Sequence, residues 1–458
     1  MATRETVNTQ AALDYVRQHP SGKVKIAYAD IDGVLRGKYI SADKFLHAAQ
    51  SGTTFCDVIF GWDASDVAYD NGRYTGWHTG YPDAPARIDL STFRRIPWEN
   101  EVPFFLGEIV DHHGNPADVC PRQLLKRVIG QLGDSGYHAV CAQEFEWFNF
   151  SETPATAGQK NFRDLTPLTP GMFGYSILRT TLQNPFFSDL FELLRRFDVP
   201  LEGLHTETGP GVLEAAITYA DALTAGDRAI LFKSGVKEIA YKHQIMATFM
   251  AKISEHLPGC GGHVHQSLWD KDRKVNLFFD AKDRSKMSDL MKSYIAGQLY
   301  CMPYLLPLFA PTVNSYKRLV QGAWAPTTLT WAVDNRTVAL RVLNGSATST
   351  RLETRVIGAD ANPYLAMAGA LGAGLYGIRK QLKLEQPATV GNGYHDLAHG
   401  VLPATLWDAT QAMKQSGVAE EILGAGFVEH FAATREWEWR QSLKSVTDWE
   451  MKRYFEII

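Results

Sequence analysis

Apolar and polar residues alternate with a period of two in several segments of the chain, and this pattern predicts β-strands. These segments are VKIAYADID (24–32), FFLGEIV (104–110), AVCAQEFEWFNF (139–150), GVLEAAITYA (211–220), GGHVHQSLWD (261–270), TVALRVLN (337–344) and TRLETRVIG (350–358). A repeat of about 3.6 residues instead predicts helices. The helical segments are residues 8–19, 41–50, 121–136, 234–257 and 361–382. Strands and helices mix without a clear parallel pattern, so the sequence predicts an α+β fold.

A polar segment that contains prolines, DHHGNPADVCPR (111–122), separates two unlike parts of the chain. Before it, short apolar segments alternate with Gly, Pro and Asp turns over residues 53–113, as in a small mixed α/β unit. After it, the chain is long enough to bury a large core. We therefore predict two domains, residues 1–115 and residues 116–458.

Composition and charge exclude several classes of protein. The chain has 458 residues and a formal net charge of −4, so no basic excess points to nucleic acid. Residues 1–20 lack the apolar core of a signal peptide, and the apolar run 364–378 is shorter than the roughly 20 residues that span a bilayer. Five scattered cysteines favour reduced thiols. We expect a cytoplasmic enzyme with no nucleic-acid and no membrane partner.

Ionisable side chains recur two residues apart inside these apolar strands, so the members of each pair point to the same face. The pairs are Glu144 with Glu146, His263 with His265 and Glu353 with Arg355, and Glu207 and Glu214 flank a Gly-Pro-Gly turn. A single pair of this kind usually marks only the solvent face of a strand. If the strands form one sheet, however, the pairs gather carboxylates and imidazoles in one cavity.

Such a cavity favours hard divalent cations. Four or five carboxylates with one or two histidines suit Mg²⁺ or Mn²⁺ better than zinc. Crowded carboxylates also need cations, because like charges resist joint ionisation. Cys260 and His263 have the spacing of half a zinc site, but no second pair follows at the spacing of a zinc finger.

A second group of residues is cationic and closely spaced in the sequence. It consists of Lys317, Arg318, Arg336, Arg341, Arg351 and Arg355. Arginine binds carboxylates and phosphates with two parallel hydrogen bonds. A surface patch would have the same composition, but beside a divalent-metal cavity these residues indicate a clamp for phosphoryl transfer. The chain has no P-loop motif, and GAGLYG (372–377) lies inside a helical pattern, where small residues serve helix packing.

Taken together, the motifs resemble the glutamine synthetase family over nearly the whole chain. They are YADIDGVLRGK (28–38), EFEWF (144–148), TETGPGVLE (206–214), VKEIAYKHQIMATFM (236–250), GGHVHQSL (261–268), NSYKRLVQGAWAP (314–326), DNRTVALRV (334–342) and RLETRVIGADANPYLA (351–366). Their details are most similar to the branch of γ-glutamyl-polyamine and other γ-glutamyl-amide synthetases. The resemblance implies an N-terminal β-grasp domain and a catalytic domain whose antiparallel sheet lines an active-site funnel.

The resemblance also implies a role for each site residue. One metal ion would be bound by Glu146, Glu207 and Glu214, and a second by Glu144, His263 and Glu353. Glutamate would be bound by Arg318, Gly259 and Arg355, and ATP with its transferred phosphate by His265, Ser267, Arg336, Arg341, Arg351 and Arg355. Asp63 falls near the place where the family's N-terminal domain supplies an acid to the amine pocket of a neighbouring subunit. We expect ATP as substrate, two or three Mg²⁺ or Mn²⁺ ions per site, and a dodecamer of two stacked hexamers with active sites between subunits.

In the implied reaction, the γ-carboxylate of glutamate attacks the γ-phosphate of ATP to give γ-glutamyl phosphate. An amine then displaces phosphate and leaves a γ-glutamyl amide. The amine loses a proton in this step, so a base or carboxylate is expected near it.

Trp324 departs from the family pattern at the amine site. Ammonium-using members carry the motif G-x-E-A-P, whose Glu helps to bind and deprotonate ammonium, whereas this chain has GAWAP (322–326). An aromatic ring offers a wall for the carbon part of a larger amine, with a cation–π contact of roughly 0.5–2 kcal/mol. The alternative is that Trp324 packs under the loop. The sequence leaves the amine open, with a slight preference for apolar amines.

Two further observations bear on the alternatives. Pro258 stands where ammonium-using members carry an Asn that contributes to glutamate binding, and proline has no amide donor. An acid substrate other than glutamate therefore stays open. A true glutamine synthetase is disfavoured by Trp324, and a catalytically inactive relative is disfavoured because all six metal-ligand positions are retained. Tyr394 lies near the adenylylation site of bacterial enzymes, but its surroundings differ, and we predict no such regulation.

Overall fold

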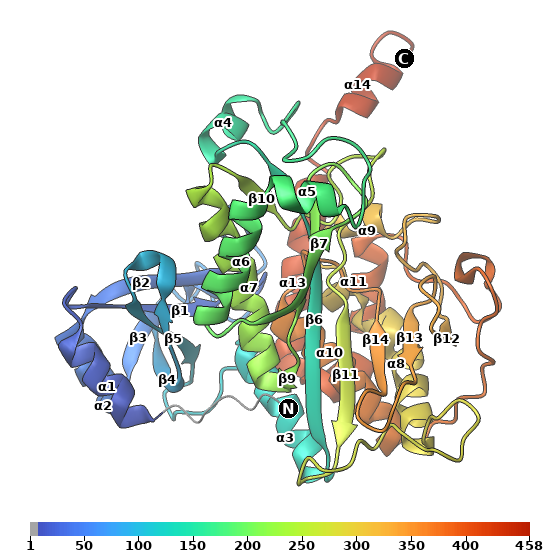
Figure 1. The fold of residues 1–458 in the computed structure, drawn as a ribbon, viewed down its shortest axis with the longest axis horizontal. Coiled ribbons are helices and arrows are strands. Elements are labelled where there is room, and N and C mark those ends of the chain that lie inside the picture. The colour runs from blue at the N-terminus through green and yellow to red at the C-terminus, as the bar shows by residue number, and fades with distance from the viewer. Residues whose placement is uncertain (1–7) are drawn as a thin grey trace.

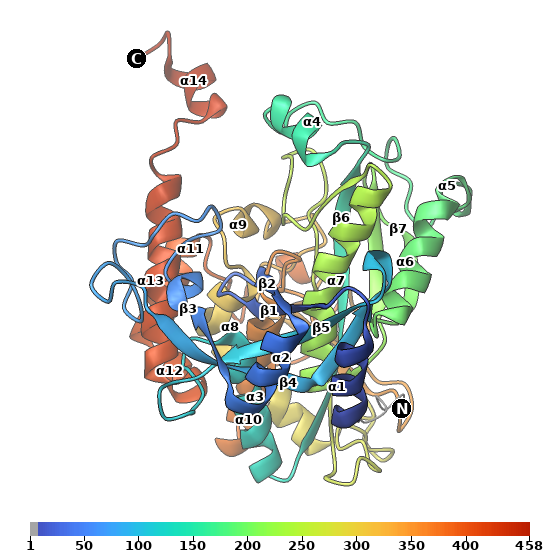
Figure 2. The same ribbon diagram turned by 90° about the vertical axis from the view of Figure 1, so that its left-hand side faces the viewer.

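The computed structural model describes residues 8–458, and it contains two β-sheets (Figures 1 and 2). The first sheet has the strand order β2-β1-β5-β4-β3. Its strands are β1 (Lys23–Ala29), β2 (Leu35–Ser41), β3 (Thr53–Cys56), β4 (Asp83–Ile96) and β5 (Val102–Ile109). Strands β1 and β5 are parallel and the other pairs are antiparallel. Helices α1 (Thr9–Gln18) and α2 (Ala42–Ser51) pack on this sheet, as their amphipathic patterns predict.

The second sheet has the order β12-β13-β14-β11-β6-β8-β7, and β9 and β10 also pair with β6. Its strands are β6 (His138–Phe150), β7 (Leu201–Thr206), β8 (Val212–Ile217), β9 (Ala220–Asp221), β10 (Met246–Thr248), β11 (Val264–Trp269), β12 (Trp331–Val333), β13 (Leu340–Leu343) and β14 (Arg351–Thr354). Only β12 and β13 run parallel among these pairs. The predicted α+β fold is confirmed.

One face of this sheet is covered by helices (Figure 1). Helix α10 (Pro363–Arg379) contacts α3 (Pro121–Asp134), α7 (Ala222–Lys242) and α8 (Asp289–Phe309), as well as strands β6 and β11. The remaining helices are α4 (Pro154–Gln159), α5 (Ile177–Leu182), α6 (Asn184–Arg196), α9 (Ser315–Arg318), α11 (Leu406–Gln415), α12 (Val418–Leu423), α13 (Ala425–Ser442) and α14 (Asp448–Tyr454). No helix within residues 8–458 is both long enough and apolar enough to cross a membrane.

The packing of β6 explains why its carboxylates face away from these helices. Phe145 and Trp147 are fully buried, and both rings lie 5.5 Å from the ring of Phe232 on α7. Because side chains alternate across a strand, Glu144 and Glu146 point to the opposite face. The apolar alternation of this strand therefore also determines which face is left for polar chemistry.

The glycines of α10 serve helix packing, as their helical context predicts. A Cβ at Gly374 would lie 2.0 Å from the ring of Tyr294 on α8, and one at Gly377 would lie 2.2 Å from the carbonyl oxygen of Ser293. The backbones of α8 and α10 approach each other too closely for any side chain there.

The helix predicted over residues 234–257 is wrong at both ends. Helix α7 begins at Ala222 and ends at Lys242, and Gln244 has φ 58°, a left-handed conformation that does not continue a helix. Residues 246–248 instead pair antiparallel with the end of β6. Ala247 and Phe249 pack into the core, so the apolar spacing in this segment comes from the short strand β10 and the irregular chain that follows it.

Candidate active site

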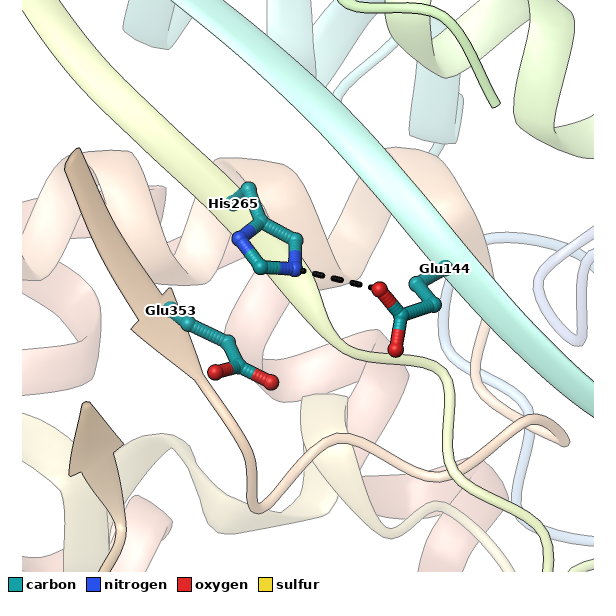
Figure 3. Close-up of side chains that lie close together, drawn as sticks. All are labelled: Glu144, His265 and Glu353. Carbon is teal, nitrogen blue, oxygen red and sulfur yellow. Dashed lines mark ion pairs between the residues drawn. The ribbon is translucent and has the colours of Figure 1, made fainter. Parts of the chain in front are cut away.

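Three neighbouring strands of the second sheet place a glutamate, a histidine and a second glutamate side by side (Figure 3). His265 on β11 stands opposite Glu353 on β14, and β11 also pairs with β6, which carries Glu144. Each residue offers a ligand atom that lies within 4.8 Å of the others. His265 Nε2 lies 3.5 Å from Glu144 Oε2, the contact that Figure 3 marks.

His263 joins this group from the backbone just before β11. Its Nδ1 lies 3.3 Å from Glu353 Oε1 and 3.8 Å from Glu144 Oε1. The structure thus brings together the predicted trio of Glu144, His263 and Glu353, with His265 as a fourth member. We call these four residues the first ligand group.

A second ligand group consists of His205 near the end of β7, Glu207 just after that strand and Glu214 within β8. His205 Nε2 lies 3.4 Å from Glu214 Oε1, and its Nδ1 lies 3.8 Å from Glu207 Oε2. The ring of Tyr175 stacks on the imidazole at 4.3 Å between centroids. Neither His205 nor Tyr175 was among the predicted site residues. The spacing of His205 and Glu207, two residues apart near the end of a strand, is the signal that would have identified the histidine.

Glu146 was expected to complete the ligand set of Glu207 and Glu214, but it belongs to neither close group among the described residues. It lies opposite Glu214 across the β6–β8 pair. Its Oε2 accepts a 2.6 Å hydrogen bond from the backbone N–H of Gly261, which draws the carboxylate towards the loop before β11.

The electrostatics of the two groups fit divalent cations. Burial, together with nearby Glu144 and Glu146, raises the pKa of Glu214 to about 8 despite its hydrogen bond with His205. Burial disfavours the charged form of Glu144 as well, but hydrogen bonds from His263 and His265 lower its pKa well below the usual range. A carboxyl group that resists ionisation beside other carboxylates is stabilised in its charged form by a cation. Oxygen-rich donors with imidazoles suit Mg²⁺ or Mn²⁺.

Two arginines bind the carboxylate of Glu353, which is only 1 % exposed. Arg341 Nη1 donates to Glu353 Oε2 at 3.1 Å, and Arg355 donates to Oε1. Burial opposes ionisation, but His265, Arg355 and His263 lower the pKa of Glu353 to about 2. Arg341 also pairs with Asp334, and Arg355 Nε donates to the carbonyl oxygen of Arg336 at 3.1 Å. Two of the predicted phosphate-binding arginines, Arg341 and Arg355, are therefore bonded directly to the first ligand group, and Arg336 is linked to it through Arg355.

Two hollows adjoin the first ligand group. One is a cavity of about 370 Å³, whose lining includes Glu144 and the predicted ATP-side residues His265, Ser267 and Arg351. The other is an open hollow of about 700 Å³, which we call the Trp324 hollow. Its lining includes Trp324, Asp334, Arg336, Arg341 and Val390. Arg341 lines the Trp324 hollow and bonds to Glu353, whereas His265, which lies beside Glu353, lines the other cavity. The first ligand group therefore lies between the two hollows.

Arg318 and Gly259 lie against each other, as residues that bind one substrate would. A Cβ on Gly259 would lie 2.7 Å from Arg318 Cγ, so no side chain fits there. Arg318 is 3 % exposed, and it donates to the carbonyl oxygens of Val356 at 2.9 Å and Arg355 at 3.2 Å. It lines neither hollow.

Asp63 is not brought to the Trp324 hollow within one chain. Its Oδ1 accepts hydrogen bonds from the N–H groups of Ser65 and Val67, at 2.8 and 3.0 Å. Its Oδ2 accepts one from Trp437 Nε1 on α13 at 2.9 Å. The role expected for Asp63 in a neighbouring subunit stays a prediction.

A sheet that presents carboxylates, histidines and arginines between two hollows has the donor set that could hold divalent cations and bind anionic substrates, as in a class of metal-dependent enzymes. The family model of the glutamine synthetase catalytic domain matches residues 118–454, and the chain belongs to the glutamine synthetase family of ligases. The predicted family is confirmed.

Relatives with different named activities match almost the whole chain. Type-1 glutamine synthetase 2 of Dictyostelium discoideum is 52 % identical over 449 residues, which cover 97 % of this chain and 86 % of that protein. Glutamate–isopropylamine ligase of a Pseudomonas species is 36 % identical over 449 residues, which cover 97 % of each chain. The solved GmaS/ADP complex matches with a TM-score of 0.83 at 27 % identity, over 97 % of this chain and 99 % of that chain. The predicted glutamine synthetase-type fold is confirmed.

Proposed function

We propose that this protein is an ATP-dependent ligase that joins the γ-carboxylate of L-glutamate to an organic amine. The observation that carries the proposal is Trp324, an aromatic ring that lines a hollow beside Arg336 and Arg341. The resemblance places a glutamate at this position in ammonium-using enzymes. An apolar ring in place of a carboxylate suits the carbon part of an amine and removes the attraction for a small cation.

The conformation of Trp324 supports a role towards a ligand. The residue has φ 57°, in the left-handed region that costs a side chain about 1–2 kcal/mol. It is 62 % exposed, so the ring does not pack under its loop. A strained backbone that presents a large ring to a hollow is typical of a functional position.

A second candidate function is the formation of glutamine from ammonium. It is favoured by the Dictyostelium relative, which is 52 % identical to this chain and is named a glutamine synthetase. The organic amine is favoured by Trp324 and by the Pseudomonas relative, which is named for isopropylamine. We regard an apolar alkylamine as the better candidate, because Val333 and Val390 also line the Trp324 hollow.

The proposed site assigns distinct tasks to the two hollows. ATP would occupy the 370 Å³ cavity beside Ser267, His265 and Arg351. Mg²⁺ or Mn²⁺ would be bound by the two ligand groups, and when bound would neutralise the phosphates and hold them in position. Glu353 holds Arg341 and Arg355 in place, and in the proposed site the remaining N–H donors of these arginines would bind the transferred phosphoryl group.

The reaction then proceeds in two displacements. A γ-carboxylate oxygen of glutamate, bound near Arg318 and Gly259, attacks the terminal phosphorus, and the bond from phosphorus to the ADP oxygen breaks. The amine nitrogen next attacks the acyl carbon, the bond from that carbon to the phosphate oxygen breaks, and the proton that the nitrogen loses passes to the departing phosphate. The two arginines stabilise the charge that moves to phosphate in both steps.

The proposed working form is a homo-oligomer, a dodecamer of two hexamers. Helix α14 projects from the body of the chain (Figures 1 and 2), and Trp449, Phe455 and Ile458 are exposed along this segment. A short helix with no packed face is only marginally stable in water, so contact with another subunit would stabilise it. We retain the division into residues 1–115 and 116–458 as part of this proposal, and the start of the family match at residue 118 supports it.

The function is tested by phosphate release from ATP with Mg²⁺ and L-glutamate across a panel of amines that includes ammonium. We expect isopropylamine or another alkylamine to support a kcat/KM at least about tenfold above that of ammonium, which corresponds to 1.4 kcal/mol in the transition state. Efficient use of ammonium with no preference for any organic amine would contradict the proposal and favour the glutamine synthetase alternative. If none of the amines supported turnover, the protein would be an inactive relative.

His205 is expected to contribute to cation binding in the second ligand group. His205→Ala should weaken Mn²⁺ binding by about tenfold or more, as the loss of metal-site residues does. Free Mn²⁺ measured by electron paramagnetic resonance gives this affinity without turnover. The matched control is His256→Ala, because that imidazole is 84 % exposed on a loop. If the two variants bound Mn²⁺ with equal affinity, His205 would not be a metal ligand.

A further inference from the structure

Asp334 brings a carboxylate to the wall of the Trp324 hollow. It directly follows β12, and its backbone N–H donates to the carbonyl oxygen of Val342 at 3.0 Å. Its φ of 46° is left-handed, a conformation that Asp adopts more readily than most residues. The side chain is 73 % exposed, and within residues 8–458 it is the one carboxylate in the lining of this hollow.

One oxygen of this carboxylate is bonded and the other is open. Arg341 donates to Asp334 Oδ1 from Nε at 3.1 Å and from Nη2 at 2.5 Å. Oδ2 accepts no hydrogen bond from the part of the chain that the structure describes. Arg341 also bonds to Glu353, so Asp334 is held in place from the first ligand group. Because a carboxylate accepts about four hydrogen bonds, Asp334 keeps acceptor capacity for a ligand.

The charges around the hollow leave this carboxylate available for a cation. The other charged side chains of the lining are Arg336 and Arg341, which are proposed to bind phosphate. Arg341 is already paired with Glu353 and Asp334, and a bound phosphate would balance Arg336. The rest of the lining consists of the Trp324 ring, two valines and neutral polar residues. With phosphate bound, the hollow combines an open carboxylate oxygen with an aromatic ring, which suits an alkylammonium ion.

We propose that Asp334 is a specificity-determining residue, which binds the ammonium group of the organic amine at Oδ2 while Trp324 covers the carbon part. This inference rests on the proposed function and deepens it. Alkylamines are cations at neutral pH, as a lysine side chain with a pKa of about 10.4 is. Because the lining of the hollow holds one carboxylate among residues 8–458, the second ammonium group of a diamine has no acidic partner there. The preferred substrate is therefore a small alkyl monoamine.

Asp334 could instead serve only to position Arg341, and the two roles predict different kinetics. A residue that acts through Arg341 affects the transferred phosphate, so its loss lowers kcat with every nucleophile. A residue that binds the ammonium group affects the KM for charged amines and spares uncharged ones. The charge of the nucleophile therefore separates the two roles.

The test compares Asp334→Asn with the unchanged full-length protein, by phosphate release with saturating ATP, Mg²⁺ and L-glutamate. Asn keeps the shape of the side chain and tolerates the left-handed backbone, but it lacks the charge. We expect the KM for isopropylamine to rise at least about tenfold and kcat to change less than about threefold. The matched control is Asp272→Asn, because that side chain is 69 % exposed and pairs with Lys274 at 3.1 Å. It should change neither quantity.

Hydroxylamine, which is uncharged at neutral pH, is the second nucleophile. Its KM should change less than about threefold in Asp334→Asn. An equal rise in KM for both nucleophiles, or a fall in kcat at unchanged KM, would mean that Asp334 acts only through Arg341 and would overturn the inference. Putrescine used in preference to isopropylamine by the unchanged protein would also contradict it.

The outcomes separate this inference from the proposed function. The proposed function depends on which amine the unchanged protein uses, whereas the inference depends on the ratio between Asp334→Asn and the unchanged protein. A preference for ammonium would contradict the proposed function, yet a tenfold higher KM for ammonium in Asp334→Asn would still support binding of the cationic nitrogen at Asp334. Use of organic amines with an unchanged KM in Asp334→Asn would overturn the inference alone. Absence of turnover with every amine would overturn both.

Discussion

Replacement of Glu353 by alanine is expected to lower the rate of amide formation by about a hundredfold to a thousandfold. Glu353 lies beside His263 and His265 and bonds to both Arg341 and Arg355. Its loss removes a cation ligand and releases the two arginines that are proposed to hold phosphate. Phosphate release under saturating ATP, Mg²⁺ and amine measures the effect.

The same change also affects folding, so a second variant is needed. Removing one member of a buried ion pair costs roughly 3–5 kcal/mol, because the remaining charges are left uncompensated. Glu353→Gln keeps the shape of the side chain and should unfold at a higher temperature than Glu353→Ala, yet it should lose most of its activity. The control Glu192→Gln affects an exposed pair with Arg195 and should change neither quantity. If Glu353→Gln retained more than a tenth of the normal rate, the proposed role of the carboxylate would be wrong.

Trp324→Glu is expected to reverse the preference between organic amines and ammonium. The variant restores a carboxylate that attracts a small cation and accepts its proton, and it removes the wall for an alkyl group. We expect kcat/KM for the preferred organic amine to fall at least about tenfold, a loss of about 1.4 kcal/mol, and ammonium to become the better substrate. The same amine panel measures both changes.

Two further variants separate this role from a structural one. Trp324→Gly removes the ring and relieves the left-handed backbone strain, so it should raise stability by up to about 1–2 kcal/mol while the amine preference is lost. The control Trp449→Glu changes another exposed tryptophan, 59 % exposed on α14, and should leave the amine preference unchanged. If Trp324→Glu left the amine preference unchanged and lowered the stability of the protein, Trp324 would have a packing role and no role in amine selection.

The main elements of the fold could be predicted from the sequence because their patterns arise from burial on one face. In β6, Phe145 and Trp147 pack against Phe232, and the alternation that buries them also leaves Glu144 on the open face. The glycines of α10 were assigned to helix packing for a similar reason, since a helical context excludes a nucleotide-binding turn. Residues 243–257 were misassigned because a short strand and an irregular chain that cover a sheet also bury apolar side chains, here Ala247 and Phe249.

The finer geometry of the candidate site could not be predicted, because it depends on side-chain directions and on loops from distant parts of the chain. Alternation predicted that Glu144, His263 and Glu353 would share a surface, and the structure brings them together. It could not predict that the N–H of Gly261 would bond to Glu146, or that Tyr175 would stack on His205. The exposure of Trp324 depends on its left-handed backbone conformation, which the pattern of apolar and polar residues does not predict.

The central claim is most directly tested by identifying the product. L-glutamate, ATP and Mg²⁺ are incubated with the protein and an equimolar mixture of ammonium, isopropylamine, ethanolamine and putrescine, and the amides are quantified by mass spectrometry. We expect a γ-glutamyl amide of an organic amine to exceed glutamine, with the isopropyl or another alkyl amide as the main product. Glutamine as the main product would contradict the claim.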